Sequence, residues 1–392
     1  MKARFLPALA LTAAMFSLGG VAPAAWANEG TSAPGGPLVI AKQGNFYVGG
    51  REAATPSGPV ISGAMYVEFQ IPAEQKHPYP LVFFHGGASS GASFWSTPDG
   101  REGWATLFLR KGYAVYVVDR PTLGRSPHYE VVDGAKLMPP TSLPKREGEA
   151  APPPATSQPA HLPGPNQPGD PAYEHMRRAR QSSIEVPFGA PDDALATSIY
   201  VDRLDREAGA ALLDRIGPAI LVTHSRAGTS GWQIADARPD LVKAIIAAEP
   251  NGPPFYNAPP MGAPGDPVVR PFGITYEGLQ FDPPVSRLRD FGPIEQQPPQ
   301  DEHKVGCWTV KGEMPRLVNL ARVPVMVLVG GASYHSSYDH CTAQFLERAG
   351  VPVDLVPLDE HGFVGNTHGF PTETNNHLIA DFIARWLAER DL

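Results

Sequence analysis

The sequence predicts an α/β fold in which a mostly parallel sheet carries helices on both faces. Three observations support this prediction. Several short runs consist almost entirely of Val, Ile, Leu and Phe, as strands buried on both faces do. Helical patterns separate these runs, in the alternation that builds parallel sheets. The chain has 392 residues, 42% hydrophobic and 18% charged, which is enough apolar material for a globular core.

The start of the chain has the pattern of a secretory signal peptide, residues 1–27. Lys2 and Arg4 precede an apolar run, and the small residues Ala25 and Ala27 form an exit for cleavage after Ala27. A membrane anchor is the alternative, which we disfavour because the apolar run is too short to span a bilayer. We therefore expect a periplasmic or secreted protein with no membrane span once the signal is removed.

Charge and cysteine content are consistent with export. Loss of Lys2 and Arg4 with the signal changes the formal net charge from −8 to −10, because residues 1–27 contain no acid. An acidic exported protein is a poor candidate for nucleic-acid binding. Cys307 and Cys341 are the only cysteines of the sequence, and in an oxidising compartment we expect a disulfide between them. The sequence leaves a homo-oligomer open.

We assign a single domain to residues 28–392, and strands dominate its first part. The segments 37–51 and 62–72 predict two strands joined by a connection rich in Gly and Pro. The next elements alternate: YPLVFF at 79–84 predicts a buried strand, residues 101–112 a helix, and AVYVVD at 114–119 a further strand.

The alternation continues to the end of the chain. A helix at 200–217 precedes the strand AILVTH at 219–224, and a second helix at 225–239 closes at Pro239. The remaining elements are strands at 242–250, 323–331 and 351–358, and helices at 342–350 and 375–390.

Two segments interrupt this rhythm, at about 129–195 and 251–320. Both are rich in Pro and Gly. The first includes residues 137–171, whose many prolines can hardly be accommodated in a helix or a central strand. A disordered linker is the alternative for the first segment. Because neither segment has a core pattern of its own, we expect one domain with two lid-like insertions.

The run AILVTHSRAGTSG has the form of a nucleophile elbow. Ser225 follows a buried strand directly, and a helix with small residues begins behind it. The tight turn needs small residues two positions to either side, where Thr223 and Ala227 stand in place of the usual glycines. The helix amino terminus favours negative charge that develops near the serine. Ser225 is therefore the candidate nucleophile, and a plain N-cap serine is the alternative.

The loop FFHGGASSG, residues 83–91, follows another buried strand. Gly86 and Gly87 let the backbone turn N–H groups toward the site, as an acyl-transfer enzyme requires beside its serine. The amide of Arg226, directly after the candidate nucleophile, is the second expected donor.

A carboxylate is needed to orient the catalytic histidine. Glu249 directly follows the apolar run AIIAA at a strand end, where such an acid is expected. The strand VPVMVLVGG offers no acid at its end, and Asp339 comes several residues later. A surface carboxylate is the alternative for Glu249.

These motifs, in this order, resemble exported bacterial esterases of the α/β-hydrolase fold with a Ser–Glu–His triad, in which the acid follows the sixth strand. The resemblance runs from about residue 37 to the C-terminus, with gaps at the two insertions. It rests on NFYVGGRE, FFHGG, TPDGREGWATLFLRKGYAVYVVDRPTLGRS, THSRAG, AAEP, and GNTH followed by NNHLIADFIARWL.

The resemblance implies roles for five residues: Ser225 as nucleophile, Glu249 as acid, His368 as base, and Gly87 and Arg226 as donors of the oxyanion amides. Some relatives carry adjacent cysteines after the HG of the oxyanion loop. Here Gly87 and Ala88 stand in those positions, so any role of such cysteines is absent.

The stretch HGFVGNTHGF contains His-Gly-Phe twice, which offers two candidate bases. His368 lies in the GNTH segment ahead of the final helix, where the resembling family places its base. His361 lies beside two acids close behind a strand, and is the alternative.

The cluster HSSYDHC, residues 335–341, has metal-ligand residue types, but a disulfide at Cys341 would remove one ligand, and we predict no metal. The predicted function is a serine esterase that hydrolyses a small-molecule carboxylic ester through an acyl-enzyme, with no cofactor. A lactonase or amidase with the same triad is the alternative among enzymes. A non-catalytic binding protein of the same fold is the alternative outside them.

Overall fold

The structure is a computed structural model that describes residues 36–134, 154–184, 194–262 and 267–392. The predicted signal peptide lies outside the described residues. Residues from Gly36 to Leu392 group into one unit. No helix within the described ranges is both long enough and apolar enough to cross a membrane.

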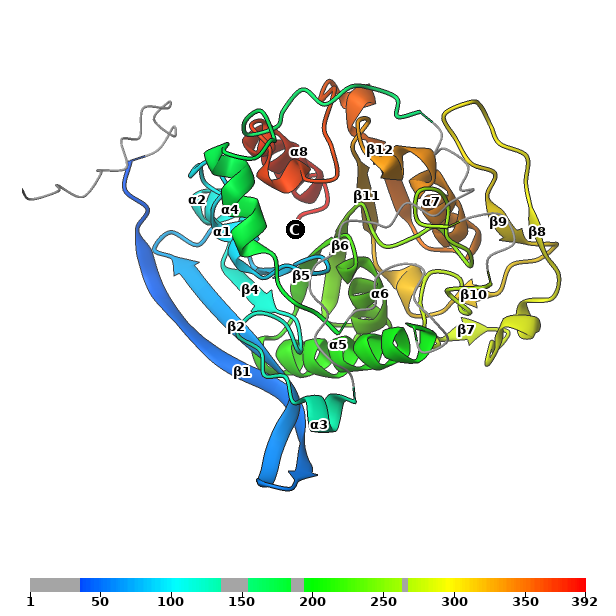
Figure 1. Ribbon diagram of the computed structural model, residues 1–392, viewed down its shortest axis with the longest axis horizontal. Helices are drawn as coiled ribbons and strands as arrows, with labels where there is room; N and C mark the ends of the chain where they lie inside the picture. Colours follow the sequence, from blue (N-terminus) through cyan, green and yellow to red (C-terminus); the bar gives the residue numbers. More distant parts are fainter. Residues whose placement is uncertain (1–35, 135–153, 185–193, 263–266) are drawn as a thin grey trace, which may run out of the picture. The chain divides into compact units, whose positions relative to one another are not determined.

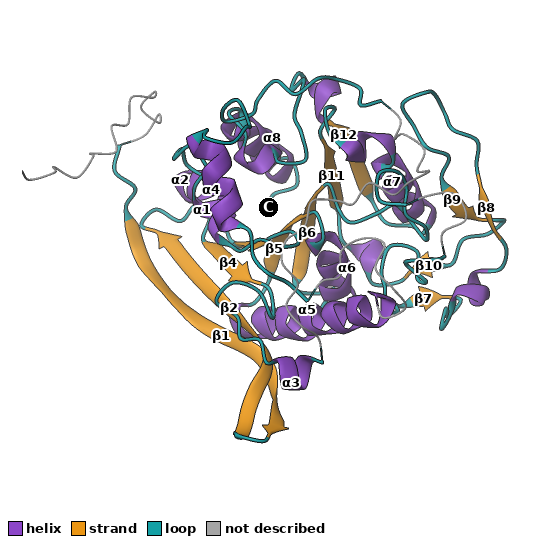
Figure 2. Ribbon diagram, in the orientation of Figure 1, coloured by secondary structure: helices purple, strands orange, loops and turns teal. Residues whose placement is uncertain are grey.

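The predicted α/β fold class is confirmed by a central eight-stranded sheet (Figures 1 and 2). Its strands are β1 (Ile40–Thr55), β2 (Gly58–Pro72), β3 (Leu81–Phe84), β4 (Val115–Asp119), β5 (Ala219–His224), β6 (Val242–Ala248), β11 (Val325–Val329) and β12 (Val353–Pro357). They are ordered β1-β2-β4-β3-β5-β6-β11-β12. The β1–β2 and β2–β4 pairs are antiparallel, and all other pairs are parallel. The carboxyl ends of the parallel strands therefore meet at one edge.

Helices pack on both faces of this sheet (Figure 2). The α-helices of the described residues are α1 (Ala92–Trp95), α2 (Trp104–Arg110), α3 (Glu130–Asp133), α4 (Pro171–Ala179), α5 (Ala194–Ile216), α6 (Ala227–Ala237), α7 (Asp339–Arg348) and α8 (Asn376–Ala388). The predicted helices therefore form, although α7 begins at Asp339, three residues before the predicted start.

The core has two layers, because side chains alternate along each strand. On β3, Val82 and Phe84 pack with Trp232 of α6 in one layer. Leu81 and Phe83 of the same strand pack in the other layer with Phe108 of α2. Strands that are buried on both faces need apolar residues throughout, which explains the unbroken apolar runs in the sequence.

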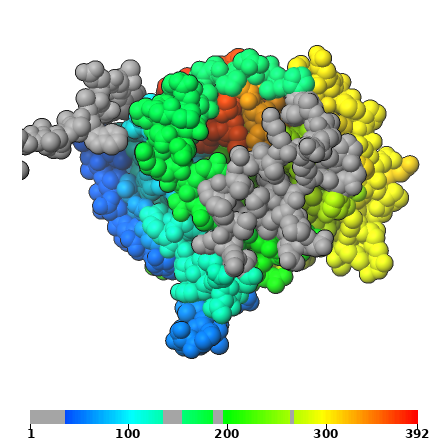
Figure 3. Space-filling view, viewed as in Figure 1, coloured from blue at the N-terminus to red at the C-terminus, as the bar shows by residue number. Residues whose placement is uncertain are grey.

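One described segment of the first insertion crosses over the C-terminal loops. The strap, which we define as residues 154–161, donates hydrogen bonds from Ser157 N to Gly331 O at 3.2 Å and from Ala160 N to Gly365 O at 2.9 Å. Figure 3 shows the green surface of this segment lying across the orange and red C-terminal surface. Residues 135–153 and 185–193 of this insertion lie outside the described residues.

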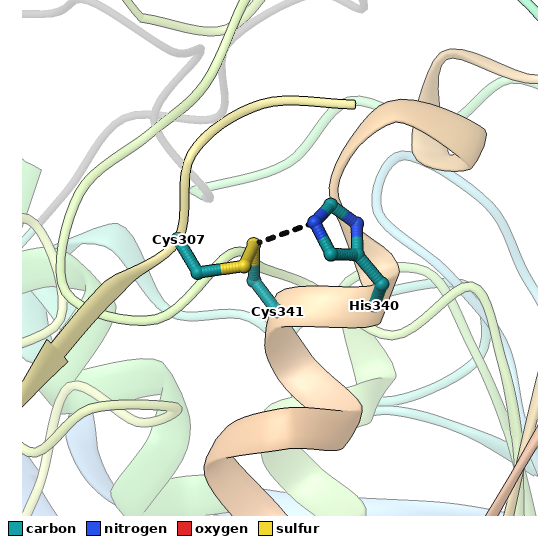
Figure 4. A group of neighbouring side chains, drawn as sticks. All are labelled: Cys307, His340 and Cys341. Carbon is teal, nitrogen blue, oxygen red and sulfur yellow. Dashed lines mark hydrogen bonds between the residues drawn. A yellow bond between two sulfur atoms is a disulfide. The ribbon is translucent and has the colours of Figure 1, made fainter. Parts of the chain in front are cut away.

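The second insertion contains short strands and 3-10 turns. They are β7 (Phe281–Asp282), η1 (Leu288–Phe291), β8 (Ile294–Gln296), β9 (Trp308–Val310), β10 (Arg316–Leu317) and η2 (Leu320–Arg322). β7 pairs with β10, and β8 with β9. The expected disulfide between Cys307 and Cys341 is present, with Cα atoms 5.2 Å apart, and it ties this insertion to α7 (Figure 4).

Candidate active site

Ser225 occupies the sharp turn between β5 and α6. Its φ of 55° is in the left-handed region, which costs a non-glycine residue about 1–3 kcal/mol. The turn is held because Ser225 N donates to Ala248 O at 3.0 Å, and Ser225 O accepts from Gly228 N and Asn251 N, each at 2.9 Å. Neighbouring strands and the following helix thus fix the serine at the carboxyl edge of the sheet.

Gly231 of α6 lets the elbow tolerate Thr223 two residues before the serine, and Gly228 of the same helix leaves room for Pro250 after β6. A Cβ at Gly231 would lie 2.9 Å from Thr223 Cγ2, and a Cβ at Gly228 would lie 2.5 Å from Pro250 Cβ. Each contact is shorter than real Cβ atoms tolerate. The usual motif has a glycine before the serine, which leaves this space empty. Here the missing side chain of Gly231 on the facing helix leaves room for Thr223 instead.

Glu249 lies at the end of β6 and is fully buried. Its φ of 45° is also in the left-handed region, which turns the side chain away from the strand direction. Oε1 accepts from Gly330 N at 2.8 Å, and Oε2 accepts from Ser333 Oγ at 2.7 Å. The carboxylate is thus fastened to the loop after β11.

His368 bridges the acid and the serine. Its Nδ1 lies 2.5 Å from Glu249 Oε2, and its Nε2 lies 2.9 Å from Ser225 Oγ. Because the carboxylate only accepts, Nδ1 carries the hydrogen and Nε2 is left to accept from the serine hydroxyl. The backbone is held as well, since His224 Nε2 donates to His368 O at 2.9 Å. The structure therefore brings three sequence-predicted residues into one chain of hydrogen bonds.

His361, the other candidate base, is not part of this chain. It ends the 3-10 turn η4 (Leu358–His361), is exposed, and its ring lies 5.0 Å from that of Phe382. Asp339, the other candidate acid, faces His335 rather than His368, with 2.9 Å between Asp339 Oδ2 and His335 Nδ1.

The loop after β3 lies against the serine. A Cβ at Gly86 would lie 2.9 Å from Ser225 Cβ, so only glycine allows this approach. His85 holds the loop, since its Nδ1 lies 2.8 Å from Gly86 O and its Nε2 accepts from Arg120 N at 3.0 Å. Gly87, a predicted oxyanion donor, is the next residue and is exposed.

The other predicted oxyanion donor, Arg226, is the N-cap of α6, so its amide lies at the helix amino terminus. Its side chain points into the protein. Nη1 donates to Asp202 Oδ1 at 3.0 Å, and the guanidinium lies 5.0 Å from the ring centre of Tyr276. Asp202 is fully buried, so the Arg226 side chain serves as its counter-charge.

The charges around the site favour a neutral base beside an ionised acid. Burial lowers the pKa of His368, and the hydrogen bond to Glu249 only partly opposes this. Burial alone would raise the pKa of Glu249, but the charge of His335 and the hydrogen bonds from His368 and Ser333 outweigh it and lower that pKa. Burial lowers the pKa of His224 to about 3, so this histidine stays neutral as a hydrogen-bond donor.

Two groups of residues among those described have metal-ligand donors within 4.8 Å of one another. In the first, His340 Nε2 lies 3.4 Å from Cys341 Sγ, but both cysteines are in the disulfide and cannot ligate as thiolates (Figure 4). The second consists of Glu249, His335 and His368, whose donors already engage one another or their neighbours. We assign no metal to either group.

Sequence reasoning missed the residues that support this chain of hydrogen bonds. Ser333 donates to Glu249, and His335 packs its ring on that of His368, with 4.7 Å between ring centres and 7° between planes. For His335 the signal was the motif HSSYDHC, whose residue types are those of metal ligands, whereas Ser333 precedes this motif and had no signal.

Comparisons with known proteins place the chain in a family. No family model matches the chain. A protein described as a probable secreted lipase, from a fungal species, is 36% identical over 351 residues, which cover 88% of this chain and 89% of that protein. The chain belongs to the family of this lipase. The protein is accordingly a carboxylic ester hydrolase.

The fold is shared with a solved structure described as a novel bacterial esterase. The two align with a TM-score of 0.57 at 22% identity, and the alignment covers 92% of this chain and 100% of that one. At this identity the likeness concerns the fold alone, and it agrees with the α/β-hydrolase fold that the sequence predicts.

Proposed function

We propose that the protein is a serine esterase in which Ser225, His368 and Glu249 act as nucleophile, base and acid of a catalytic triad. The observation that carries this proposal is the hydrogen-bond chain from Ser225 Oγ through the His368 ring to Glu249. Membership of a lipase family supports it. Such a triad makes a serine hydroxyl, which is a weak nucleophile alone, reactive toward an ester carbonyl.

The reaction follows from the proton positions. His368 Nε2 takes the hydroxyl proton as Ser225 Oγ bonds to the carbonyl carbon, and returns it to the departing alcohol. Water then attacks the acyl-enzyme by the same route and releases the acid. Glu249 stabilises the imidazolium that forms at each step. A neutral His368 before attack, which its lowered pKa favours, is the state that this sequence needs.

We assign stabilisation of the oxyanion to the backbone amides of Gly87 and Arg226. The close approach of Gly86 to Ser225 and the position of Arg226 at the start of α6 support this assignment. Preorganised amides of this kind contribute about 10²–10³ in rate.

The two insertions, at about 129–195 and 251–320, are proposed to frame a small-molecule ester substrate. For the first insertion, the contacts of the strap with Gly331 and Gly365 support this, because both residues lie in loops next to the site. Export of the protein, to the periplasm or beyond, is supported by the signal pattern in residues 1–27, the disulfide, and a relative described as secreted.

The proposal is tested by Ser225→Ala. We expect this variant to fold and to lose hydrolysis of p-nitrophenyl esters, measured over a series of graded acyl lengths that also defines the substrate preference. Near-normal turnover by a folded variant would refute the triad. A wild-type protein that cleaves lactones or amides but no linear ester would favour the same triad with another substrate. No turnover and no labelling at Ser225 would indicate a binding protein.

A further inference from the structure

The motif HSSYDHC lies directly behind the proposed base, in a 3-10 turn η3 (Tyr334–Ser337) and the first turn of α7. Its members His335 and Asp339 are only 3% and 1% exposed. The mechanism proposed above uses neither residue. We assign no metal to them, because His335 and Asp339 already contact each other. Their burial beside the site therefore needs another explanation.

Two contacts connect His335 to the triad. Its ring stacks on that of His368, with 4.7 Å between centres and 7° between planes. Its backbone N donates to Ser333 Oγ at 3.2 Å, and that hydroxyl donates to Glu249 Oε2 at 2.7 Å. One short turn thus contacts both the base and the acid.

A third contact gives His335 its own acid. Nδ1 of His335 lies 2.9 Å from Asp339 Oδ2, one helical turn later. The site therefore holds two buried carboxylates, Glu249 and Asp339, each paired with a histidine, and the two histidine rings stack on each other. If stacking were the only need, a phenylalanine would supply it without the cost of burying a pair of ionisable groups.

We propose that His335 and Asp339 form a second imidazole–carboxylate pair that positions the His368 ring and supplies a positive charge beside Glu249. His335 touches neither the substrate nor Ser225, so it is a positioning residue. This inference rests on the proposed function, since it assigns His335 a role through the triad.

The charge state of the pair follows from the groups around it. Burial alone would lower the pKa of His335, but the charges of Asp339 and Glu249 outweigh it and raise that pKa. Burial raises the pKa of Asp339 to about 6, although His335 opposes this, and the two groups titrate as a coupled pair in which the histidine is the stronger base. The titratable and charged groups that face the pair are Glu249, His368, His224, Tyr334, Tyr338 and, on the Asp339 side, Lys304.

The positive charge of His335 affects the pKa of the proposed base, His368. It opposes protonation of His368 and lowers that pKa, so the base remains free in weakly acidic solution. Removal of this charge must raise the pKa of His368. Activity should then be lost at a higher pH as the solution is acidified.

Variants can separate the stacking from the charge. In His335→Ala, which loses both, we expect kcat to fall about 100-fold at unchanged KM, the order of loss that follows a displaced catalytic group. In His335→Phe, which keeps an aromatic ring, most of this loss should be recovered. The acid limb of kcat/KM against pH should nevertheless move to higher pH in His335→Phe and in Asp339→Asn. His361→Phe is the matched control, because its exposed ring contacts Phe382 away from the site, and its pH profile should equal that of the wild type.

An acid limb that stays in place in both His335→Phe and Asp339→Asn overturns the inference, since a purely structural residue would change stability without moving it. If these variants do not fold, the wild-type protein provides the test. Nitrogen NMR of labelled histidines should show the His335 ring mostly doubly protonated at pH 6.5, and a mostly neutral ring at that pH overturns the inference. An active Ser225→Ala variant would instead remove the proposed function itself.

Discussion

Glu249→Gln replaces one carboxylate oxygen of the proposed acid by an amide nitrogen, and the surrounding hydrogen bonds determine which oxygen is replaced. Gly330 N donates to Oε1 of Glu249, so the amide oxygen of a glutamine must take that position to keep a buried N–H satisfied. The amide NH2 then faces His368 Nδ1 in place of Oε2. Two donors cannot share that contact. The ring must therefore move its hydrogen to Nε2, where it can no longer accept the proton of Ser225.

The expected loss is large. An imidazole held in the wrong tautomer by such an exchange costs about 10⁴ in kcat, which is about 5.5 kcal/mol at 1.36 kcal/mol per decade. KM should change little, because Glu249 is fully buried behind the base. The assay is steady-state hydrolysis of a p-nitrophenyl ester, with far-UV circular dichroism to establish that the variant folds. Turnover within tenfold of the wild type would refute the reasoning and move the acid elsewhere, with Asp339 as the next candidate.

Three further predictions follow from the same geometry. His368→Ala should lower kcat by at least about 10³, since the serine loses its base, whereas His361→Ala should stay within about threefold; the reverse pattern would make the first His-Gly-Phe the catalytic one. In the wild type, the lowered pKa of His368 keeps the base neutral to lower pH, so the acid limb of kcat/KM should have its midpoint below pH 6.5, and a midpoint at or above 6.5 would contradict a lowered pKa at His368. Cys341→Ser removes the disulfide between residues 34 positions apart and should lower the free energy of unfolding by about 3–4 kcal/mol, measured by urea denaturation. Two free thiols in the wild-type protein would contradict this prediction.

The sheet could be predicted because local patterns suffice to define it. The inner parallel strands are buried on both faces and so leave unbroken apolar runs, as in β3 and β5, whereas the edge strand β12 is only partly buried. The elbow at Ser225 and the acid at Glu249 follow such runs directly, which is why sequence alone selected them. The short helix α4 also had a local signal, an Asp170 cap followed by Pro171, that the surrounding proline content obscured.

The support of the site could not be predicted in the same way. The stacking of His335 on His368 joins residues 33 positions apart across two loops, and neither loop has a periodic pattern. The strap reaches Gly331 and Gly365 mainly through backbone hydrogen bonds, which any residue type can make, with one further bond from Thr156 Oγ1 to Gly331 O. Such contacts depend on how the sheet arranges its loops. Sequence reasoning therefore found the motif HSSYDHC and predicted no metal there, but had no local signal for the contact of His335 with the base.

The most direct test of the triad is covalent capture of the nucleophile. The wild-type protein should react with a fluorophosphonate at one site, and peptide mapping by mass spectrometry should find the adduct on Ser225. Labelling should be absent in Ser225→Ala and strongly slowed in His368→Ala, because the serine then lacks its base. An adduct on another residue, or a Ser225→Ala variant that still labels and still hydrolyses esters, would contradict the account.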